Sequence, residues 1–179
     1  MAHNSDEIIA KLSNIVLFKS FKDKPEELKK IASIMRPVFF KKDEWIINEG
    51  DAGDSLYILK SGEVLITKKT LEKEEYTIVK LTGEMNVFFG ELALLDEDKR
   101  SASIIALTDC ELWEIKRKDF FELGEKEPYL CLIITREIAK ILASRLRKTS
   151  SDIIILFEAL VEEIGTDWKK FYNHLINYE

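Results

Sequence analysis

The chain has 179 residues, which is long enough for one filled core with appended helices but too short for two ordinary domains. Apolar residues make up 46% and charged residues 34%, a balance typical of soluble globular proteins that excludes extensive disorder. The formal net charge of −6 at pH 7 disfavours binding to nucleic acid or to an anionic membrane, so an anion site would have to be a local pocket.

The sequence gives no signal for export, membrane insertion or metal binding. The first residues lack the basic start and apolar run of a secretory signal, and no stretch approaches the roughly 20 apolar residues needed to cross a bilayer. We therefore expect a cytoplasmic protein without membrane contact. Cys110 and Cys131 form no CxxC motif, which predicts buried, reduced thiols. His3 and His174 lie near the two ends, so we expect no metal site.

The first elements in chain order are two short helices. Apolar residues recur at helical spacing over residues 6–18, and Pro25 suits the first helical position of the segment PEELKKIASIM. Pro37 ends that pattern, because the residue before a proline is displaced from the helical region of backbone conformations.

The next region, from Val38 to about Ile115, consists of short runs rich in β-branched and aromatic residues. Five of the seven glycines fall within it, at positions 50, 53, 62, 83 and 90, as expected where tight turns require a positive φ. Short strands with regular turn signals predict an antiparallel jelly-roll β-barrel over residues 38–116.

Helical periodicity returns after Lys118. The segment DFFEL predicts a short helix, and Pro128 then begins a long helix expected over residues 128–150. Further apolar residues at helical spacing predict a C-terminal helical extension over residues 151–179. The predicted fold class is therefore α+β and mostly β, with one domain over residues 1–150: N-terminal helices, a barrel, a long C-terminal helix and then the helical tail.

One stretch, FFGELALLDEDKRSASIIA, carries the chemistry that a ligand site would need. Arg100 has a planar guanidinium that can bind two phosphate oxygens at once, whereas Glu91 is an acceptor-only carboxylate that suits a hydroxyl donor such as a ribose 2′-OH. Small residues around both would let backbone amides approach a ligand; they are Gly90, Ala93, Ser101 and Ala102. The pattern predicts recognition of a phosphate attached to a ribose, without turnover.

Together with EGDAGDSLYILKSGEV upstream, this stretch resembles the cyclic-nucleotide-binding domain of catabolite activator protein and of the regulatory subunits of cyclic-AMP-dependent protein kinase. The resemblance covers about residues 12–150. In that family's phosphate-binding cassette, a glutamate holds the ribose hydroxyl and an arginine holds the cyclic phosphate, which implies these roles for Glu91 and Arg100. It also implies that the four small residues supply surrounding donors and that Leu92 relays cassette movement to the hinge beyond the barrel.

The loop between the two ligand residues departs from that family's pattern. Many members have a proline directly before the arginine, whereas this chain has Lys99. Three acids, Asp96, Glu97 and Asp98, also lie in this loop. We expect them to face solvent, because unpaired carboxylates avoid burial.

The resemblance also implies contacts to the base. In the family the long helix often covers the base, and Arg145 and Thr149 lie on one face of that helix at i, i+4 spacing. Arg145 would stack on a purine and Thr149 would form a hydrogen bond with it, although both residues could equally be solvated. Ser101, directly after the arginine, is compatible with cyclic AMP and cyclic GMP; we favour cyclic AMP.

Other functions find no support in the sequence. Activator-type relatives carry a winged helix-turn-helix after the long helix, whereas residues 151–179 are about half as long as such a unit and contain no basic recognition helix. We therefore expect a stand-alone receptor that does not bind DNA. No GxSxG, Walker-type or HExxH motif occurs, so we expect no enzyme.

The leading hypothesis is a regulatory protein that binds cyclic AMP or cyclic GMP and transmits binding to its C-terminal helices. We expect a homodimer through those helices and an effector protein that the sequence does not identify. The alternative is a structural or dimerisation module that has the same fold and binds no nucleotide, with Glu91 and Arg100 merely paired on a turn.

Overall fold

The structure is a computed structural model that describes residues 2–69 and 74–164. The chain divides into two compact units, residues 1–138 and 139–179. The first unit contains the strands and the short helices. Within the described residues, the second unit consists of the continuation of the C-terminal helix.

Three short helices precede the strands: α1 (Ala2–Asn14), the 3₁₀ helix η1 (Val16–Phe21) and α2 (Pro25–Ser33). Pro25 lies in the first turn of α2, as its fixed φ and missing N–H favour. Pro37 is the third residue of the first strand, which lies at the edge of its sheet, where the missing N–H interrupts no ladder on the outer side.

Eight strands form two antiparallel sheets, which confirms the predicted antiparallel architecture of this region. Their bounds are β1 (Met35–Phe40), β2 (Trp45–Ile47), β3 (Ser55–Ser61), β4 (Glu63–Lys69), β5 (Glu75–Thr82), β6 (Phe88–Phe89), β7 (Ser103–Ala106) and β8 (Cys110–Lys116). The order is β1-β8-β3-β6 in one sheet and β2-β7-β4-β5 in the other. Each pairing is antiparallel.

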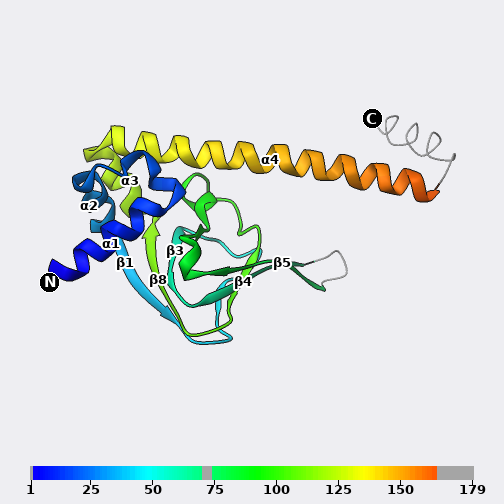
Figure 1. Cartoon of the computed structure of the whole chain (residues 1–179), viewed down its shortest axis with the longest axis horizontal. Coiled ribbons are helices and arrows are strands. Elements are labelled where there is room, and N and C mark those ends of the chain that lie inside the picture. The colour runs from blue at the N-terminus through cyan, green and yellow to red at the C-terminus, as the bar shows by residue number, and fades with distance from the viewer. Residues whose placement is uncertain (1, 70–73, 165–179) are drawn as a thin grey trace. The chain divides into compact units, whose positions relative to one another are not determined.

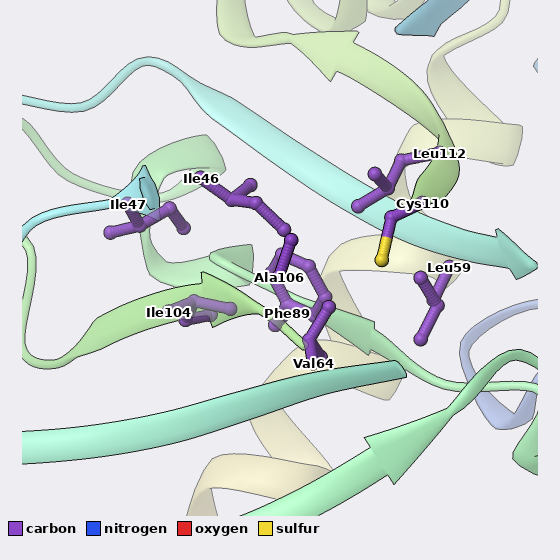
Figure 2. Close-up of a cluster of buried hydrophobic side chains, with 9 residues drawn as sticks. All are labelled: Ile46, Ile47, Leu59, Val64, Phe89, Ile104, Ala106, Cys110 and Leu112. Carbon is purple, nitrogen blue, oxygen red and sulfur yellow. The ribbon is translucent and has the colours of Figure 1, made fainter. Parts of the chain in front are cut away.

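The two sheets share one apolar core, because alternate residues of each strand face inward. Figure 2 shows Val64 and Ala106 from one sheet beside Phe89 from the other. Cys110 also lies in this core, and both it and Cys131 are free and buried, as predicted.

Helices cover one end of the strands. Figure 1 shows α1, α2 and α3 (Arg117–Lys126) gathered there. Between β5 and β7 the chain forms two 3₁₀ turns, η2 (Gly83–Met85) and η3 (Glu91–Leu94). Leu94 of η3 lines a small apolar cavity of about 10 Å³ together with Phe120 of α3 and Ile134 of the next helix. The end of η3 therefore packs against the helices that follow the barrel.

The last described element is α4 (Pro128–Ile164), which begins at Pro128 as predicted but continues beyond Ser150, where the sequence predicts its end. The hydroxyls of Ser150 and Ser151 donate hydrogen bonds of 2.9 and 3.1 Å to the carbonyls of Leu146 and Arg147. Both serines are thus accommodated inside the helix rather than ending it. The predicted C-terminal extension after Ile164 lies outside the described residues.

None of the helices in the described ranges 2–69 and 74–164 combines the length and the apolar character that crossing a bilayer demands.

Candidate functional site

The cassette, which we define as residues 88–106, begins with a sharp reversal at Gly90. This residue has a φ of 76°, in the left-handed region that glycine adopts without a steric penalty. A Cβ at Gly90 would also lie 2.7 Å from Nη1 of Arg100. Glu91 follows directly as the first residue of η3, with only 3% of its surface exposed. The turn therefore buries Glu91 directly after the glycine that Arg100 lies against.

The side chain of Arg100 is held in a fixed orientation. Its Nη2 donates to the backbone carbonyl of Ser55 at 2.8 Å and its Nη1 donates to the carbonyl of Gly90 at 3.2 Å. The guanidinium also lies 6.0 Å from the centre of the Tyr57 ring, within the range of a cation–π contact. Burial lowers the pKa of Arg100 below its usual value. A partly desolvated cation of this kind gains more from an anionic partner than a cation in water does.

The backbone of Arg100 is fixed by the upstream motif. Its N–H donates to the carbonyl of Asp51 at 2.8 Å, and its carbonyl accepts from the N–H of Gly50 at 2.9 Å. Gly53 lies directly against the side chain of Arg100, because a Cβ there would lie 2.0 Å from Nε of Arg100. The segment EGDAGD and the cassette, separate in sequence, therefore form one structure around the arginine.

The sequence motif does not predict two neighbours of Arg100, which are Tyr57 and Arg117. Tyr57 donates its hydroxyl to Oε1 of Glu114 at 3.2 Å, and burial, helped by Glu114, raises the pKa of Tyr57. Strand alternation could have identified Tyr57, since Ser55 and Tyr57 face the same side of β3. The second neighbour is Arg117, whose Nε donates to the carbonyl of Ala93 at 2.6 Å from the start of α3. No local pattern connects Arg117 to the cassette.

The acidic loop is exposed, as predicted, and part of it has partners. Glu97 forms an ion pair with Arg117 at 3.1 Å, although 92% of the Glu97 side chain remains exposed. The carboxylate of Asp98 accepts the backbone N–H of Lys99 at 2.7 Å. A proline at position 99 would have no N–H for this contact.

The other predicted site residues are distributed along the cassette. Ala93 is buried, Leu92 and Ala102 are half-buried, and Ser101 is exposed. Gly90, the residue directly before Glu91, accepts a hydrogen bond from Arg100. The ligand roles of these residues stay predictions.

The predicted base contacts lie in the second unit. Arg145 and Thr149 are both exposed residues of α4. Their contact with a base stays a prediction. Among the residues that the structure describes, no group of three or more histidine, cysteine, aspartate or glutamate side chains is arranged to hold a metal ion.

Comparison with known sequences identifies the class of protein. The profile of the cyclic nucleotide-binding domain matches residues 37–127, half of the 179-residue chain. The cyclic AMP receptor protein of Thermus thermophilus is 34% identical over 133 residues, which are 74% of this chain and 58% of that protein. The chain therefore belongs to the cyclic nucleotide-binding domain family, whose domain is regulatory rather than catalytic.

Two further comparisons agree. Isozyme 1 of the cGMP-dependent protein kinase of Drosophila melanogaster is 33% identical over 117 residues, covering 56% of this chain and 15% of the kinase. A cyclic nucleotide-binding domain from Methylobacillus flagellatus matches in structure with a TM-score of 0.71 and 27% identity, over 85% of this chain and 83% of that one. The chain thus spans less than two thirds of the length of the curated relatives it matches.

Proposed function

We propose that this protein is a regulatory receptor that binds cyclic AMP at a site formed by the cassette and residues 50–57. The observation that carries the proposal is the fixed guanidinium of Arg100, which donates to Gly90 directly before the buried Glu91. These two groups suit the two polar parts of a cyclic nucleotide, the cyclic phosphate and the ribose hydroxyl. The membership of the chain in the family supports the same ligand class.

The proposed site holds its cation in one orientation before a ligand arrives. A guanidinium has five N–H donors, and two of those of Arg100 bond to Ser55 and Gly90. The fork is therefore held in one orientation, so binding costs little side-chain entropy. Glu91, in turn, would accept a hydrogen bond from the ribose hydroxyl. Glu91 is buried, and a hydrogen bond to a charged group contributes about 1.5–3 kcal/mol.

We favour cyclic AMP over cyclic GMP, in line with the name of the Thermus relative, a cyclic AMP receptor protein. The match to a cGMP-dependent kinase keeps cyclic GMP as the second candidate. Arg145 and Thr149 on α4 are the proposed base contacts. Gly90, Leu92, Ala93, Ser101 and Ala102 complete the proposed ligand-binding set.

Transmission to the C-terminal helices would begin at the end of η3. Leu94 is 2% exposed and lines the apolar cavity shared with Phe120 and Ile134, whereas Leu92 is only half-buried. This packing favours Leu94 over Leu92 as the residue that links the cassette to α3 and α4. A ligand shifts such a switch only if it binds one arrangement of the helices better than the other.

The proposed partners are a second copy of the chain and an effector protein. Leu146, Ile153 and Leu156 on α4 expose 60–69% of their surfaces, which suits a homodimer through this helix. The net charge of −6 lends no support to a nucleic-acid partner. The two free cysteines suit a reducing compartment, and we propose the cytoplasm.

Calorimetry with the full chain tests the ligand and the role of Arg100. We expect cyclic AMP to bind more tightly than cyclic GMP, and adenosine, which lacks the phosphate, to show no measurable binding. Arg100→Ala should weaken cyclic AMP binding at least tenfold, about 1.4 kcal/mol, because the charge-assisted bonds to the phosphate are lost. An unchanged affinity would remove Arg100 from the site.

A chemical double-mutant cycle tests Glu91. The 2′-deoxy analogue of cyclic AMP lacks the ribose hydroxyl, so it should bind the wild type several-fold more weakly. In Glu91→Gln this penalty should shrink, because the neutral amide oxygen is a weaker acceptor than the carboxylate. An equal penalty in both proteins would show that Glu91 does not contact the hydroxyl.

The alternative function is a module that keeps the fold and binds no nucleotide. Ligand at 100 times its dissociation constant adds about 2.7 kcal/mol of stability to a receptor. A thermal-unfolding midpoint that moves with neither cyclic AMP nor cyclic GMP would favour the module.

A further inference from the structure

Two arginines bridge the same two segments of the first unit. One segment is residues 53–55, where β3 begins, and the other is the cassette turn, which we define as residues 90–94. Arg100 joins them by donating to the carbonyls of Ser55 and Gly90. Arg117 joins them a second time, because its Nη2 donates to the carbonyl of Gly53 at 2.8 Å and its Nε to that of Ala93 at 2.6 Å.

Arg117 is anchored at its backbone as well. Its N–H donates to the carbonyl of Asp54 at 2.6 Å, so backbone and side chain both hold residues 53–55. The side chain of Arg117 is only 15% exposed. Its ion pair with Glu97 adds little, because Glu97 is almost fully solvated. The bonds to Gly53 and Ala93 are therefore the contacts that fix the guanidinium.

The two arginines have different tasks once a ligand binds. Arg100 bonds to Ser55 and Gly90 and offers its remaining N–H groups to an anion. Arg117 donates to other carbonyls of the same segments and keeps them together. The two guanidinium groups are also close enough for the charge of Arg117 to help lower the pKa of Arg100, after burial as the main cause. An anion near Arg100 would thus be attracted by both charges.

We propose that Arg117 is a positioning residue for the pocket: its guanidinium holds the cassette turn against residues 53–55 and ties it to the start of α3. We call these contacts of Arg117 the tether, and they are present in the protein without ligand. Its effect on ligand affinity rests on the function proposed above. Lysine at this position would keep the charge but lacks the planar fork that reaches two carbonyls in fixed directions.

Hydrogen–deuterium exchange of the ligand-free full chain tests the tether. The amides of Ala93, Leu95 and Asp96 bond to carbonyls within the cassette turn. In Arg117→Lys we expect these amides to exchange about tenfold faster, because one charge-assisted hydrogen bond or more is lost. Amides of β8 away from residue 117 should be unchanged. Equal exchange of the cassette turn in both proteins would overturn the proposal.

A matched control is Arg36→Lys. Arg36 also contacts a neighbour through its guanidinium, an ion pair of 2.8 Å with Asp119, which belongs to neither segment. We expect this variant to leave both the exchange of the cassette turn and the affinity unchanged. Faster exchange in both variants would mean that any arginine replacement loosens the fold, which would also overturn the specific role of Arg117.

Stopped-flow and calorimetric measurements with cyclic AMP test the effect on the ligand. Arg117→Lys and Arg117→Gln should both bind about tenfold more weakly, mainly through faster dissociation, because the loss is one of geometry. If Arg117→Lys binds like the wild type and only Arg117→Gln is weaker, the charge acts alone and the positioning role is wrong. If the wild type binds no cyclic nucleotide, the proposed function and the ligand part fail together, whereas the exchange experiment still decides the tether.

Discussion

The guanidinium of Arg100 lies against the backbones of two glycines. A Cβ at Gly53 would come within 2.0 Å of Nε and 2.7 Å of Cδ of Arg100. Gly53 does not need glycine for its backbone conformation, since its φ lies outside the left-handed region. What excludes a side chain there is the space that the arginine occupies.

Gly53→Ala should therefore displace Arg100 and leave the fold intact. The clashing atoms belong to the side chain of Arg100, so we expect the arginine rather than the backbone to move. Its bonds to Ser55 and Gly90 are then lost, and we expect cyclic AMP to bind at least tenfold more weakly in calorimetry.

Gly124→Ala is the matched control for this substitution. A Cβ at Gly124 would lie 3.5 Å from Cβ of Cys131, an ordinary van der Waals contact. Alanine favours the helix by about 1 kcal/mol relative to glycine, so this variant should be slightly more stable and bind normally. If Gly53→Ala also binds normally, the orientation of Arg100 does not depend on Gly53.

At this scale the sequence predicted the groups that share a local motif and missed those that do not. Glu91 and Arg100 stand in one stretch with small residues around them, and Arg100 donates to the carbonyl of Gly90, directly before Glu91. Tyr57 and Arg117 reach the same place through pairing of β3 with β8 and through the start of α3. Such contacts depend on register and helix placement, which no local spacing encodes.

At the scale of elements, the short turn η3 connects the proposed ligand site to the helices. Its first residue is the buried Glu91, and its last, Leu94, packs with Phe120 and Ile134 around the small apolar cavity. Glu91 and Leu94 lie at the two ends of a single 3₁₀ turn, so we expect movement at one end to reach the other.

Leu94→Ala should destabilise the protein and weaken this connection. Removing a buried leucine side chain costs about 2–5 kcal/mol, including the cavity left behind. Urea unfolding monitored by circular dichroism measures the loss. Cyclic AMP should still bind, because the pocket groups are untouched, but it should no longer change hydrogen exchange in α3.

Leu95→Ala is the matched control, because it makes the same leucine-to-alanine change at the adjacent residue, which is 38% exposed. It should cost less than about 1 kcal/mol. A Leu94→Ala protein in which cyclic AMP still alters exchange in α3 would show that the signal takes another route.

The sequence predicted the order of the elements better than their ends. Glycine spacing and β-rich runs identified the antiparallel region, because tight turns and alternating residues leave a strong local pattern. The end of α4 was predicted too early, near Ser150. Serine is a weak helix former, but here its hydroxyl bonds to the carbonyl of Leu146 and the helix continues.

At the scale of the whole molecule, α4 has a run of apolar side chains that the described residues leave exposed. Four consecutive residues, Ile153 to Leu156, expose between 58% and 69% of their surfaces. Successive residues of a helix point about 100° apart, so these four side chains surround it. A helix that is apolar on all sides is normally buried. These exposed side chains therefore favour an interaction surface on this part of α4.

We expect a second copy to cover this surface, so the full chain should sediment as a dimer at micromolar concentration. Replacing Ile154 and Leu156 together by lysine should give a monomer, because a dimer would have to bury the added charges without partners. Lysine is a good helix former, so α4 should persist in circular dichroism. Ser151→Lys adds the same charge at an exposed polar position just before this stretch and should remain a dimer. Monomeric wild type in sedimentation velocity, or a double variant that still dimerises, would exclude this stretch as the dimer contact.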